Sequence, residues 1–291
     1  MNPCSGKKRA NHVLADIIAV LNRGGFDVTV YMTAARGDAA QTAAQRAAEF
    51  DVVLCIGGDG TFNEVVSGLC ASGCHTPVGY IPAGSTNDFA NSLGLSKNML
   101  HAARDVVDGV ARPLDIGRFG ERYFSYIASF GAFTRASYAT PQSLKNTLGH
   151  LAYLLAGVKE LTAIRSRHLR FTLDDGTVLE DDYIFGAISN STSVAGVLTL
   201  SSSLVDMSDG IFEVLLIREP KSLVELSDCV LALSTQEYNT PMLTLASAKR
   251  VEVEGAEDMS WTLDGEYADG GEHCVIENLH NAIRVLVRPE L

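Results

Sequence analysis

Short apolar runs alternate with longer amphipathic segments over the first hundred residues of the chain. The runs at 26–33, 51–56 and 78–81 have the length of buried strands. Between the first two, the alanine-rich segment 37–50 has the composition of a helix, and Asp38 is expected to cap it. Strands separated by helices of this length predict a parallel sheet with helices on both faces.

The pattern changes near residue 110. From there on, β-rich runs follow one another, and Asp-Gly or other glycine-containing turns separate several of them. Such turns are typical of antiparallel hairpins. A helical interval is expected at 142–163. We therefore predict an α/β fold of two domains, with a doubly wound parallel α/β domain at 1–110 and a mostly antiparallel β domain at 111–291.

The bulk composition agrees with two globular domains. A chain of 291 residues with 46% hydrophobic side chains exceeds the usual size of one domain and can build real cores. No apolar run approaches the roughly 18 to 20 residues that span a bilayer, and the polar, basic start lacks the pattern of a signal peptide. Six scattered cysteines fit a reducing compartment better than a disulfide framework. We therefore expect a cytoplasmic protein.

The net charge of −12 argues against nucleic acid as the main partner. Because the chain is acidic as a whole, adsorption to an anionic membrane would have to use a local cluster of basic residues. Two basic groups are candidates for it, Lys7 to Arg9 and Arg165 to Arg170. The simpler interpretation of each group is a solvated surface.

The most informative stretch is Gly-Gly-Asp-Gly at 57–60, which directly follows the apolar run 51–56. Thr61 and Glu64 have the spacing of a capping box, so a helix should begin at Thr61. A strand, a glycine turn and a helix N-terminus direct backbone N–H groups toward one point, which suits phosphate. Asp59 would repel phosphate unless a cation lay between them. The stretch suggests a metal-nucleotide site, with a plain strand-to-helix turn as the alternative.

A second glycine turn, 82–86, follows the expected strand 78–81. Because loops that leave the carboxyl ends of parallel strands share one edge of the sheet, the turns 57–60 and 82–86 should face the same crevice. Asn87 and Asp88 are expected to cap the helix that comes next.

Two Asp-Gly sequences later in the chain each allow two interpretations. Asp264-Gly265 is either a simple hairpin turn with Glu266 at the surface, or the support of a carboxylate general base. Asp206 and Asp209 lie three residues apart and belong either to another hairpin or to the oxygen ligands of a hydrated Mg²⁺. The residues alone leave both alternatives open.

Five motifs in order carry a resemblance to a known family: NPCSG (2–6), GGDGTFNEV (57–65), PAGSTNDFA (82–90), DMSDGIFEV (206–214) and LDGEY (263–267). Together they resemble the soluble bacterial diacylglycerol kinase and YegS-like lipid kinase family, within the NAD kinase-like superfamily. The likeness extends over nearly the whole chain. It implies a nucleotide-binding first domain, a β-sandwich second domain and an active site in the cleft between them.

The resemblance also implies roles for individual residues. ATP, the co-substrate, would be bound through Asn2, Pro3, Ser5, Gly6, Thr33, Gly57, Gly58, Gly60, Thr61, Asn63 and Ser85. Glu266 would be the catalytic base, and Asp59 would act in catalysis by binding Mg²⁺ or holding the phosphate-metal assembly. A second Mg²⁺ site would use Asp206, Asp209 and the main-chain carbonyl of Ile211.

The implied activity is ATP- and Mg-dependent phosphorylation of a lipid hydroxyl, with diacylglycerol as the expected substrate and phosphatidic acid as the product, a step of phospholipid metabolism. The alternatives are a kinase for another alcohol, such as phosphatidylglycerol or a sphingoid base, and a non-catalytic nucleotide-binding regulator. The lipid would be reached by transient peripheral contact with the inner face of the membrane. A homodimer is left open.

The sequence departs from the family pattern at its start. Family members place an apolar strand before the first turn, whereas only Met1 precedes that turn in this sequence. Either the parallel sheet has one strand fewer, or residues before Met1 supply it.

Overall fold

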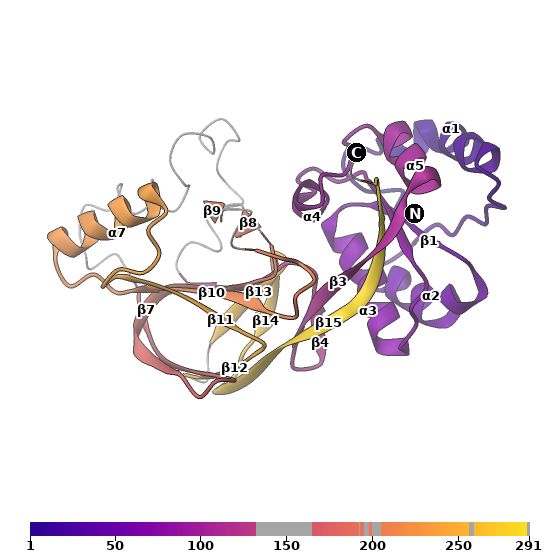
Figure 1. The fold of residues 1–291 in the computed structure, drawn as a ribbon. Helices are drawn as coiled ribbons and strands as arrows, with labels where there is room; N and C mark the ends of the chain where they lie inside the picture. The colour runs from indigo at the N-terminus through magenta and orange to yellow at the C-terminus, as the bar shows by residue number, and fades with distance from the viewer. Residues whose placement is uncertain (132–164, 192, 195–197, 200–204, 256–258, 290–291) are drawn as a thin grey trace. The chain divides into compact units, whose positions relative to one another are not determined.

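The computed structural model describes residues 1–131, 165–191, 193–194, 198–199, 205–255 and 259–289. The chain forms two compact units, Met1–Ile116 with His280–Leu291, and Gly117–Leu279. It passes between them within two long strands, β3 (Val110–Phe119) and β15 (His273–Val287), which Figure 1 labels. The sequence analysis placed the domain boundary at residue 110 and assigned all later residues to the second domain. In the structure, the C-terminal residues from His280 onward belong to the first unit. The expected helical interval 142–163 lies outside the described residues.

The first unit contains, besides parts of β3 and β15, the elements α1 (Arg9–Arg23), α2 (Asp38–Arg46), a 3-10 turn (Ala47–Glu49), β1 (Val53–Gly57), α3 (Asp59–Ser72), β2 (Val78–Pro82), α4 (Asp88–Ser92) and α5 (Met99–Asp108). β1 pairs with β2 in parallel, from Val53 opposite Val78 to Gly57 opposite Pro82. β2 in turn pairs in parallel with β15, where Val285 lies opposite Val78.

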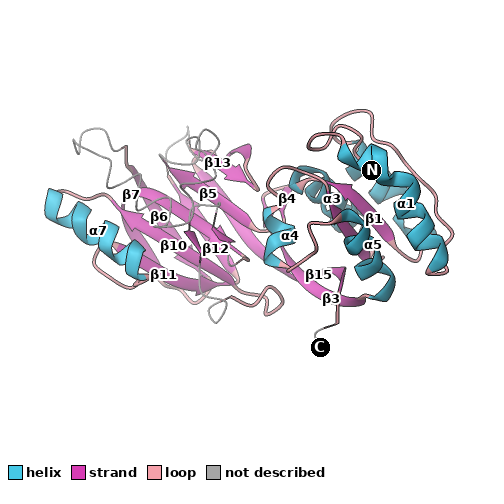
Figure 2. Ribbon diagram, turned by 90° about the horizontal axis from the view of Figure 1, so that it is seen from above, coloured by secondary structure: helices cyan, strands magenta, loops and turns pink. Residues whose placement is uncertain are grey.

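Helices cover both faces of this parallel sheet. Ile81 of β2 packs in one cluster with Ile17 of α1 and Ala103 of α5. The preceding residue, Tyr80, contacts Phe62 of α3 with ring centroids 4.6 Å apart. Successive side chains of a strand point to opposite faces, so α1 and α5 lie on one face and α3 on the other (Figure 2). The expected doubly wound parallel domain is confirmed.

The capping box expected at Thr61 and Glu64 is wrong. α3 begins at Asp59, two residues earlier, and its N-cap residue, Gly58, has no side chain to cap it. The carboxylate of Glu64 instead accepts N–H groups from Gly37 (2.9 Å) and Ala39 (3.3 Å), at the start of α2. The carboxylate of Glu64 therefore bonds to the start of α2, which is distant in sequence. The local pattern had predicted that it would cap α3, the helix to which it belongs.

Asp38 also has a different partner from the one expected. Its Oδ2 accepts N–H groups from Ala34 (2.7 Å) and Ala35 (2.8 Å), and α2 has no side-chain cap hydrogen bond from its N-cap residue, Gly37. Asp38 thus closes the loop before the helix and leaves the amides of α2 to Glu64.

The segment 26–33 is extended, but the expectation of a strand there is wrong, because the segment joins no strand ladder among the described residues. Apart from the bond of Phe26 N to Leu21 O at the end of α1 (3.1 Å), the backbone hydrogen bonds of the segment seen among the described residues join it to Met1. The Met1 amine donates to Tyr31 O (2.8 Å), and Thr33 N donates to Met1 O (3.0 Å). A strand requires a neighbouring strand along its length. The two ladder-like hydrogen bonds of this segment both go to Met1.

The second unit contains the rest of β3 and β15 together with β4 (Arg122–Phe124), β5 (Ile127–Gly131), β6 (Arg167–Leu173), β7 (Val178–Ser189), β8 (Ser193–Val194), β9 (Leu198–Thr199), β10 (Phe212–Arg218), α7 (Leu223–Thr235), β11 (Leu243–Ala248), β12 (Arg250–Glu254), β13 (Ser260–Leu263) and β14 (Glu266–Asp269). The ladders from β12 through β6, β7, β5 and β13 to β14 are antiparallel. The antiparallel β domain expected from the sequence is confirmed, whereas the sequence pattern gave no indication of α7.

Large apolar side chains fill the core of the second unit. Trp261 is almost fully buried, and its ring centroid lies 5.3 Å from that of Phe119 and 5.0 Å from that of Phe130. Such aromatic contacts dominate the burial energy of a small core. No described helix is both long and apolar enough to cross a bilayer, and all six cysteines are free thiols, as expected.

Candidate active site

Two glycine turns meet at the carboxyl ends of β1 and β2. We name them the β1 turn (57–60) and the β2 turn (82–86). A Cβ on Gly84 would stand 2.6 Å from the Cα of Gly58, a distance that real Cβ atoms do not show. Only residues without side chains allow the two backbones to approach so closely. The expectation that both turns face one place is therefore confirmed.

The N-terminal turn, 2–6, lies against the same place. A Cβ on Gly6 would stand 2.4 Å from the carbonyl oxygen of Ala83, and Gly6 has a φ of +54°. The side chain of Asn2 donates from Nδ2 to Thr61 Oγ1 over 3.0 Å. Asn2 and Thr61 come from opposite ends of the first sixty residues, and this bond fixes the N-terminal turn on the start of α3.

The residues expected to bind nucleotide are thus gathered in one part of the first unit. Thr33 lies beside Met1, to which its N–H donates over 3.0 Å. The others lie in the N-terminal turn, the β1 turn, the first turns of α3 and the β2 turn: Asn2, Pro3, Ser5, Gly6, Gly57, Gly58, Gly60, Thr61, Asn63 and Ser85. Their role in binding stays a prediction.

The start of α3 gives this place a positive electrostatic character. The N-cap residue is Gly58, and its lack of a side chain leaves the first N–H groups of α3 without a side-chain cap. Unpaired N–H groups and the helix dipole both favour an anion at such a terminus. Three backbone turns and a helix N-terminus together form a cradle suited to phosphate.

Asp59 caps α4. Its Oδ2 accepts the N–H of Asp88 (3.1 Å) and its Oδ1 the N–H of Phe89 (3.3 Å). Burial raises the pKa of Asp59, and these N–H groups partly oppose that rise. The capping role expected of Asn87 and Asp88 is wrong, because the Asn87 side chain instead closes the β2 turn through two bonds to the backbone of Gly84 (2.9 and 3.0 Å).

Glu266 belongs to the second unit. Leu263 pairs with Glu266 across the turn Asp264-Gly265, whose φ angles of +48° and +86° are those of a tight hairpin. The Glu266 side chain is 42% exposed, and its Oε2 lies 3.9 Å from Nη2 of Arg122. The expected hairpin is confirmed, and it presents a carboxylate at the surface beside a guanidinium.

Asp264 fixes this hairpin, a role that the sequence did not reveal. Its carboxylate accepts three successive backbone N–H groups, from Ser125 (2.6 Å), Tyr126 (3.1 Å) and Ile127 (3.1 Å). Hydrogen bonds to an ionised acceptor are the stronger kind. The position of Glu266 therefore depends on a carboxylate two residues earlier and on the bend between β4 and β5, almost 140 residues away in sequence.

We expect Asp264→Ala to lower the free energy of unfolding by about 2 to 3 kcal/mol, because it leaves the amides of residues 125–127 without their acceptor. For a chain of this size the loss corresponds to a fall in Tm of roughly 5 to 10 °C. Calorimetry measures it. Asp269→Ala is the control, since Asp269 accepts a single N–H, from Gly271. Equal Tm values for the two variants would contradict the role given to Asp264.

A second acidic group lies in the second unit. Asp206 Oδ1 accepts the N–H (3.0 Å) and hydroxyl (2.8 Å) of Ser208, and Asp209 Oδ1 accepts the N–H of Ile211 (2.9 Å). Glu213, which the sequence analysis did not single out, is 5% exposed. Burial, followed by the charges of Asp209 and Asp206, raises the pKa of Glu213 to about 8.

The described residues contain no group of three or more His, Cys, Asp or Glu side chains arranged to hold a metal ion. The ligand set expected at Asp206, Asp209 and the carbonyl of Ile211 has only two such side chains. It therefore stays a prediction. The side-chain oxygen Oε2 of Glu213 is buried and lacks a hydrogen-bond partner in the described structure.

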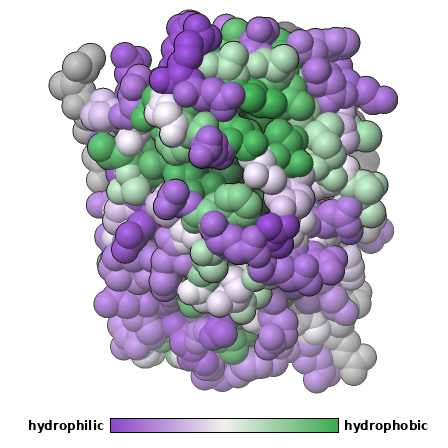
Figure 3. Space-filling view, turned by 90° about the vertical axis from the view of Figure 1, so that its right-hand side faces the viewer, coloured by the Kyte–Doolittle hydropathy of each residue, from purple (hydrophilic) through white to green (hydrophobic). Residues whose placement is uncertain are grey.

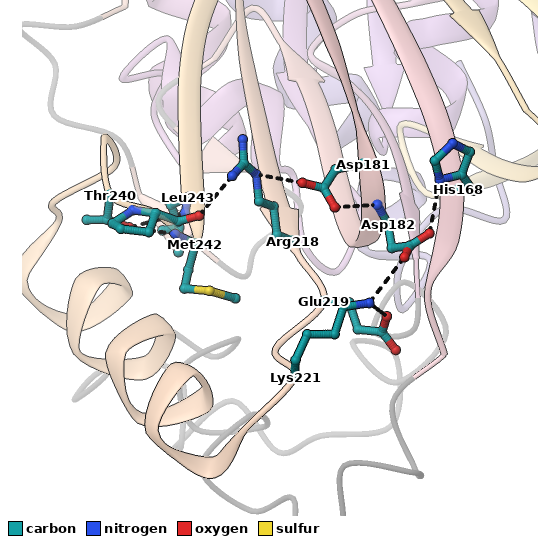
Figure 4. Close-up of polar contacts among 10 residues, drawn as sticks. His168, Asp181, Asp182, Arg218, Glu219, Lys221, Thr240, Met242 and Leu243 are labelled. Atoms are coloured by element: carbon teal, nitrogen blue, oxygen red, sulfur yellow. Dashed lines mark hydrogen bonds and ion pairs between the residues drawn. The ribbon is translucent and has the colours of Figure 1, made fainter.

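Within the basic group at 165–170, His168 lies in a network of mixed charge with Asp182 and Lys221 (Figure 4). His168 Nδ1 lies 3.1 Å from Asp182, and Arg170 Nε lies 3.9 Å from Glu180. Lys221 Nζ also reaches Asp182, over 3.1 Å. Neighbouring carboxylates therefore offset much of the positive charge that the sequence pattern showed in this group.

Two family models match the chain. Residues 1–119 match the diacylglycerol kinase catalytic domain, and residues 127–287 match the YegS C-terminal NAD kinase beta sandwich-like domain. The chain is 34% identical over 293 residues to the diacylglycerol kinase of Bacillus subtilis (strain 168), covering 99% of this chain and 95% of the relative. It is 33% identical over 269 residues to that of Staphylococcus epidermidis (strain ATCC 12228 / FDA PCI 1200), covering 91% and 84%.

Solved structures share the fold. A diacylglycerol kinase from Bacillus anthracis str. Sterne superposes with a TM-score of 0.78 at 21% identity, covering 99% of this chain and 95% of the other. An NAD kinase from Archaeoglobus fulgidus, in complex with ATP, has a TM-score of 0.53 at 12% identity, covering 99% and 91%. At such identities the likeness shows the fold alone. The family models and the curated relatives go further, and they show that this chain belongs to the diacylglycerol kinase family and is a kinase.

Proposed function

We propose that this kinase transfers the γ-phosphoryl group of ATP to a lipid hydroxyl, with diacylglycerol as the lipid and phosphatidic acid as the product. The observation that carries the proposal is the meeting of the N-terminal, β1 and β2 turns at the start of α3. The names of the relatives support the choice of diacylglycerol.

The cradle would hold ATP through the chain's own backbone. Gly58 and Gly84 let two turns approach a phosphate without side chains in the way. The N–H groups of the first turn of α3 would donate to phosphate oxygens. Asn2, Thr61 and Ser85 add side-chain donors on the rim. Phosphoryl transfer requires mainly positioning and charge stabilisation, which such a cradle supplies.

Glu266 would act as the general base. The oxygen of the lipid hydroxyl forms a bond to the γ-phosphorus while the bond from that phosphorus to the bridging oxygen of ADP breaks. The proton of the hydroxyl passes to the carboxylate of Glu266, and ADP leaves with the electron pair. A base must lie within hydrogen-bond reach of this hydroxyl, and the bonds from Asp264 to residues 125–127 would hold Glu266 for the task.

The residues beside the cradle fit a magnesium ion. Asp59 is a partly buried carboxylate next to the glycines, and its oxygens accept the N–H groups of Asp88 and Phe89. Carboxylate oxygens are hard ligands of the kind that Mg²⁺ prefers. Bound Mg²⁺ would neutralise charge on the phosphates. Asp59 would thereby link the cation to the position of α4.

The acidic group of the second unit also fits a cation. Glu213 has a buried oxygen without a partner in the described structure, and Asp206 and Asp209 are close enough to raise its pKa. The carboxylates of Asp206 and Asp209 and the carbonyl of Ile211 would supply hard oxygen ligands of the kind that Mg²⁺ prefers. A cation there would relieve the repulsion within the group and stabilise the second unit.

We expect magnesium to raise the Tm of the wild-type chain and to raise that of Asp209→Ala by less. A ligand that binds only the folded state at about one hundred times its Kd stabilises by about 2.7 kcal/mol. Melting curves at increasing magnesium concentration measure the effect. Asp228→Ala, at an exposed position of α7, is the control. An unchanged magnesium response in Asp209→Ala would contradict the site.

Contact with the membrane would be peripheral and transient, from the cytoplasmic side. Each basic residue near an anionic surface contributes only about 1 kcal/mol. The offset charge around His168 makes Lys7 to Arg9, next to the N-terminal turn, the better candidate of the two basic groups.

Incubation of the chain with labelled ATP, magnesium and a panel of lipids in mixed micelles tests the proposal. Label in phosphatidic acid supports it. Label in phosphatidylglycerol phosphate or in a phosphorylated sphingoid base would assign another alcohol. Label in no lipid, with ATP bound, would favour the nucleotide-binding regulator and overturn the proposed activity.

A further inference from the structure

Arg122 lies beside the carboxylate proposed as the general base. It is the first residue of β4, and its Nη2 lies 3.9 Å from Oε2 of Glu266. Its Nη1 donates to the carbonyl oxygen of Tyr267, the residue after Glu266, over 2.7 Å. Both side chains of the pair are partly exposed, 44% for Arg122 and 42% for Glu266. The guanidinium is therefore held next to Glu266 and remains accessible to a ligand.

The backbone that carries Arg122 is fixed by the carboxylate that also fixes the Glu266 hairpin. Asp264 accepts the N–H groups of residues 125–127, which follow β4 directly. The bond from Arg122 to Tyr267 O joins the same two segments a second time. A group held in this way needs little reordering when the substrates bind, and such preorganisation is characteristic of catalytic groups.

Other arginines of the second unit pair with carboxylates away from this hairpin. The ion pairs among the described residues include those of Arg118 and Arg250 with Glu277, of Arg170 with Glu180 and of Arg218 with Asp181. Arg122 differs from them in its partner, which is the proposed base.

The proposed reaction brings much negative charge to the neighbourhood of Glu266. The residues proposed to bind the nucleotide are uncharged, and Asp59 and Glu266 add carboxylates to the charge of the triphosphate. The start of α3 supplies only about half a positive charge. The hollow on the first unit in Figure 3 is not an alternative source, because apolar side chains form most of the lining of its cavity of about 340 Å³. Besides a bound cation, a positive side chain is therefore needed beside the acceptor.

The distances of the proposed reaction place the phosphoryl group within reach of Arg122. A general base lies about 3 Å from the hydroxyl oxygen whose proton it accepts. That oxygen approaches the phosphorus from about 3 to 3.5 Å. The phosphoryl oxygens are therefore expected roughly 5 to 7 Å from the carboxylate of Glu266. A long side chain whose guanidinium lies 3.9 Å from that carboxylate reaches them by a small rotation.

We propose that Arg122 is a further catalytic residue, which donates hydrogen bonds to the oxygens of the γ-phosphoryl group while this group passes from ATP to the lipid hydroxyl. This inference rests on the proposed function. Arg122 takes up no proton and forms no bond to phosphorus. It stabilises the negative charge that the phosphoryl oxygens carry in the transition state. Because a guanidinium has several N–H donors, Arg122 can keep its bond to Tyr267 O and still bind these oxygens.

A purely structural role for Arg122 predicts a different result. As a link between β4 and the Glu266 hairpin, the side chain would act on the stability of the second unit. Ion pairs between exposed groups contribute little to stability. Replacement of Arg122 is therefore expected to leave Tm close to that of the wild type, and a large loss of rate at unchanged Tm distinguishes the catalytic role.

Arg122→Gln tests the proposal, with Arg118→Gln as the matched control. The Arg118 side chain is also 44% exposed, and it pairs with Glu277 instead of Glu266. The acceptor in the assay is the lipid that the wild type phosphorylates. Arg122→Gln is expected to lose at least about a hundredfold in kcat and to keep the wild-type Tm and Kd for ATP. Arg118→Gln is expected to match the wild type in all three quantities.

A transition-state analogue gives a second measurement that does not depend on turnover. ADP with magnesium and aluminium fluoride mimics the phosphoryl group in transfer, and groups that act in the transition state bind such analogues more tightly than substrates. In calorimetric titration, Arg122→Gln is expected to bind this analogue at least about tenfold more weakly than Arg118→Gln does. Arg122→Lys, which keeps the charge but not the planar fork, is expected to lose less.

Equal kcat values for Arg122→Gln and Arg118→Gln would overturn the proposal. A loss of kcat accompanied by a parallel fall in Tm or in ATP affinity would overturn it as well, because Arg122 would then support the fold or the bound ground state. Failure of the proposed function is seen separately, as the absence of lipid phosphorylation by the wild type before any variant is compared. That result would overturn this inference together with the proposed function.

Discussion

Glu266→Gln is expected to retain ATP binding and to lose at least about a hundredfold in the rate of phosphoryl transfer. Glutamine keeps the size of the side chain but cannot accept the hydroxyl proton, and general-base catalysis typically contributes about 10² to 10⁴ in rate. Glu266 is partly exposed in a hairpin held by Asp264, so the substitution should leave the fold unchanged. Transfer of labelled phosphate to diacylglycerol and calorimetric titration with ATP measure the two quantities.

Glu272→Gln is the matched control, because Glu272 lies exposed in the loop before β15 and has no assigned role. It should transfer phosphate at the wild-type rate. If Glu266→Gln turned over as fast as Glu272→Gln, the base would have to be another group, and the assignment of Glu266 would be wrong.

Gly84→Ala is expected to weaken ATP binding by more than about tenfold. The added Cβ would stand 2.6 Å from the Cα of Gly58 and 2.7 Å from Oδ1 of Asn87. Because one of these atoms belongs to a backbone, no side-chain rotation relieves the contact, and the β1 and β2 turns must separate. A displacement of about 1 Å in a positioning group can cost about a hundredfold in rate, so turnover should fall as well.

Gly94→Ala provides the control for Gly84→Ala. Gly94 has a φ of +66°, and a Cβ on it meets no atom within 4 Å. Its substitution strains the backbone by about 1 kcal/mol and leaves the turns in place. Calorimetric titration should show wild-type ATP binding for Gly94→Ala. Tight ATP binding by a folded Gly84→Ala would show that the nucleotide does not use the meeting point of the two turns.

The parts of the fold that the sequence predicted are those set by local pattern. The apolar run 51–56, followed by three clustered glycines, predicts a strand, a turn and a helix in that order. The structure has β1, the β1 turn and α3 at these positions. The hairpin at Asp264-Gly265 is equally local, since two residues with positive φ define it. The candidate phosphate cradle could be predicted because its parts are such units and because parallel strands share one edge.

The parts that the sequence did not predict depend on partners distant in the chain. Glu64 has the spacing of a capping residue for its own helix, yet its carboxylate bonds to Gly37 and Ala39. Asp59 caps α4, some thirty residues away. A carboxylate forms its bonds wherever unpaired N–H groups come within reach, and local spacing does not record which helix end will be nearest in the folded chain.

The segment 26–33 and the C-terminal strand also depend on distant partners, in this case for the pairing of whole segments. The segment has the apolar pattern of a strand, but a ladder also requires a neighbouring strand, and among the described residues the segment joins no ladder. The C-terminal strand has the pattern of an antiparallel β domain for most of its length. Its last residues nevertheless pair in parallel with β2, where Val285 lies opposite Val78.

A crystal structure of the chain with Mg²⁺, a non-hydrolysable ATP analogue and diacylglycerol is the most direct test of the central claim. We predict triphosphate oxygens within about 3 Å of the amides of the β1 turn and the start of α3, with the Glu266 carboxylate within hydrogen-bond reach of the lipid hydroxyl. A triphosphate bound elsewhere, or a Glu266 remote from both substrates, would contradict the account.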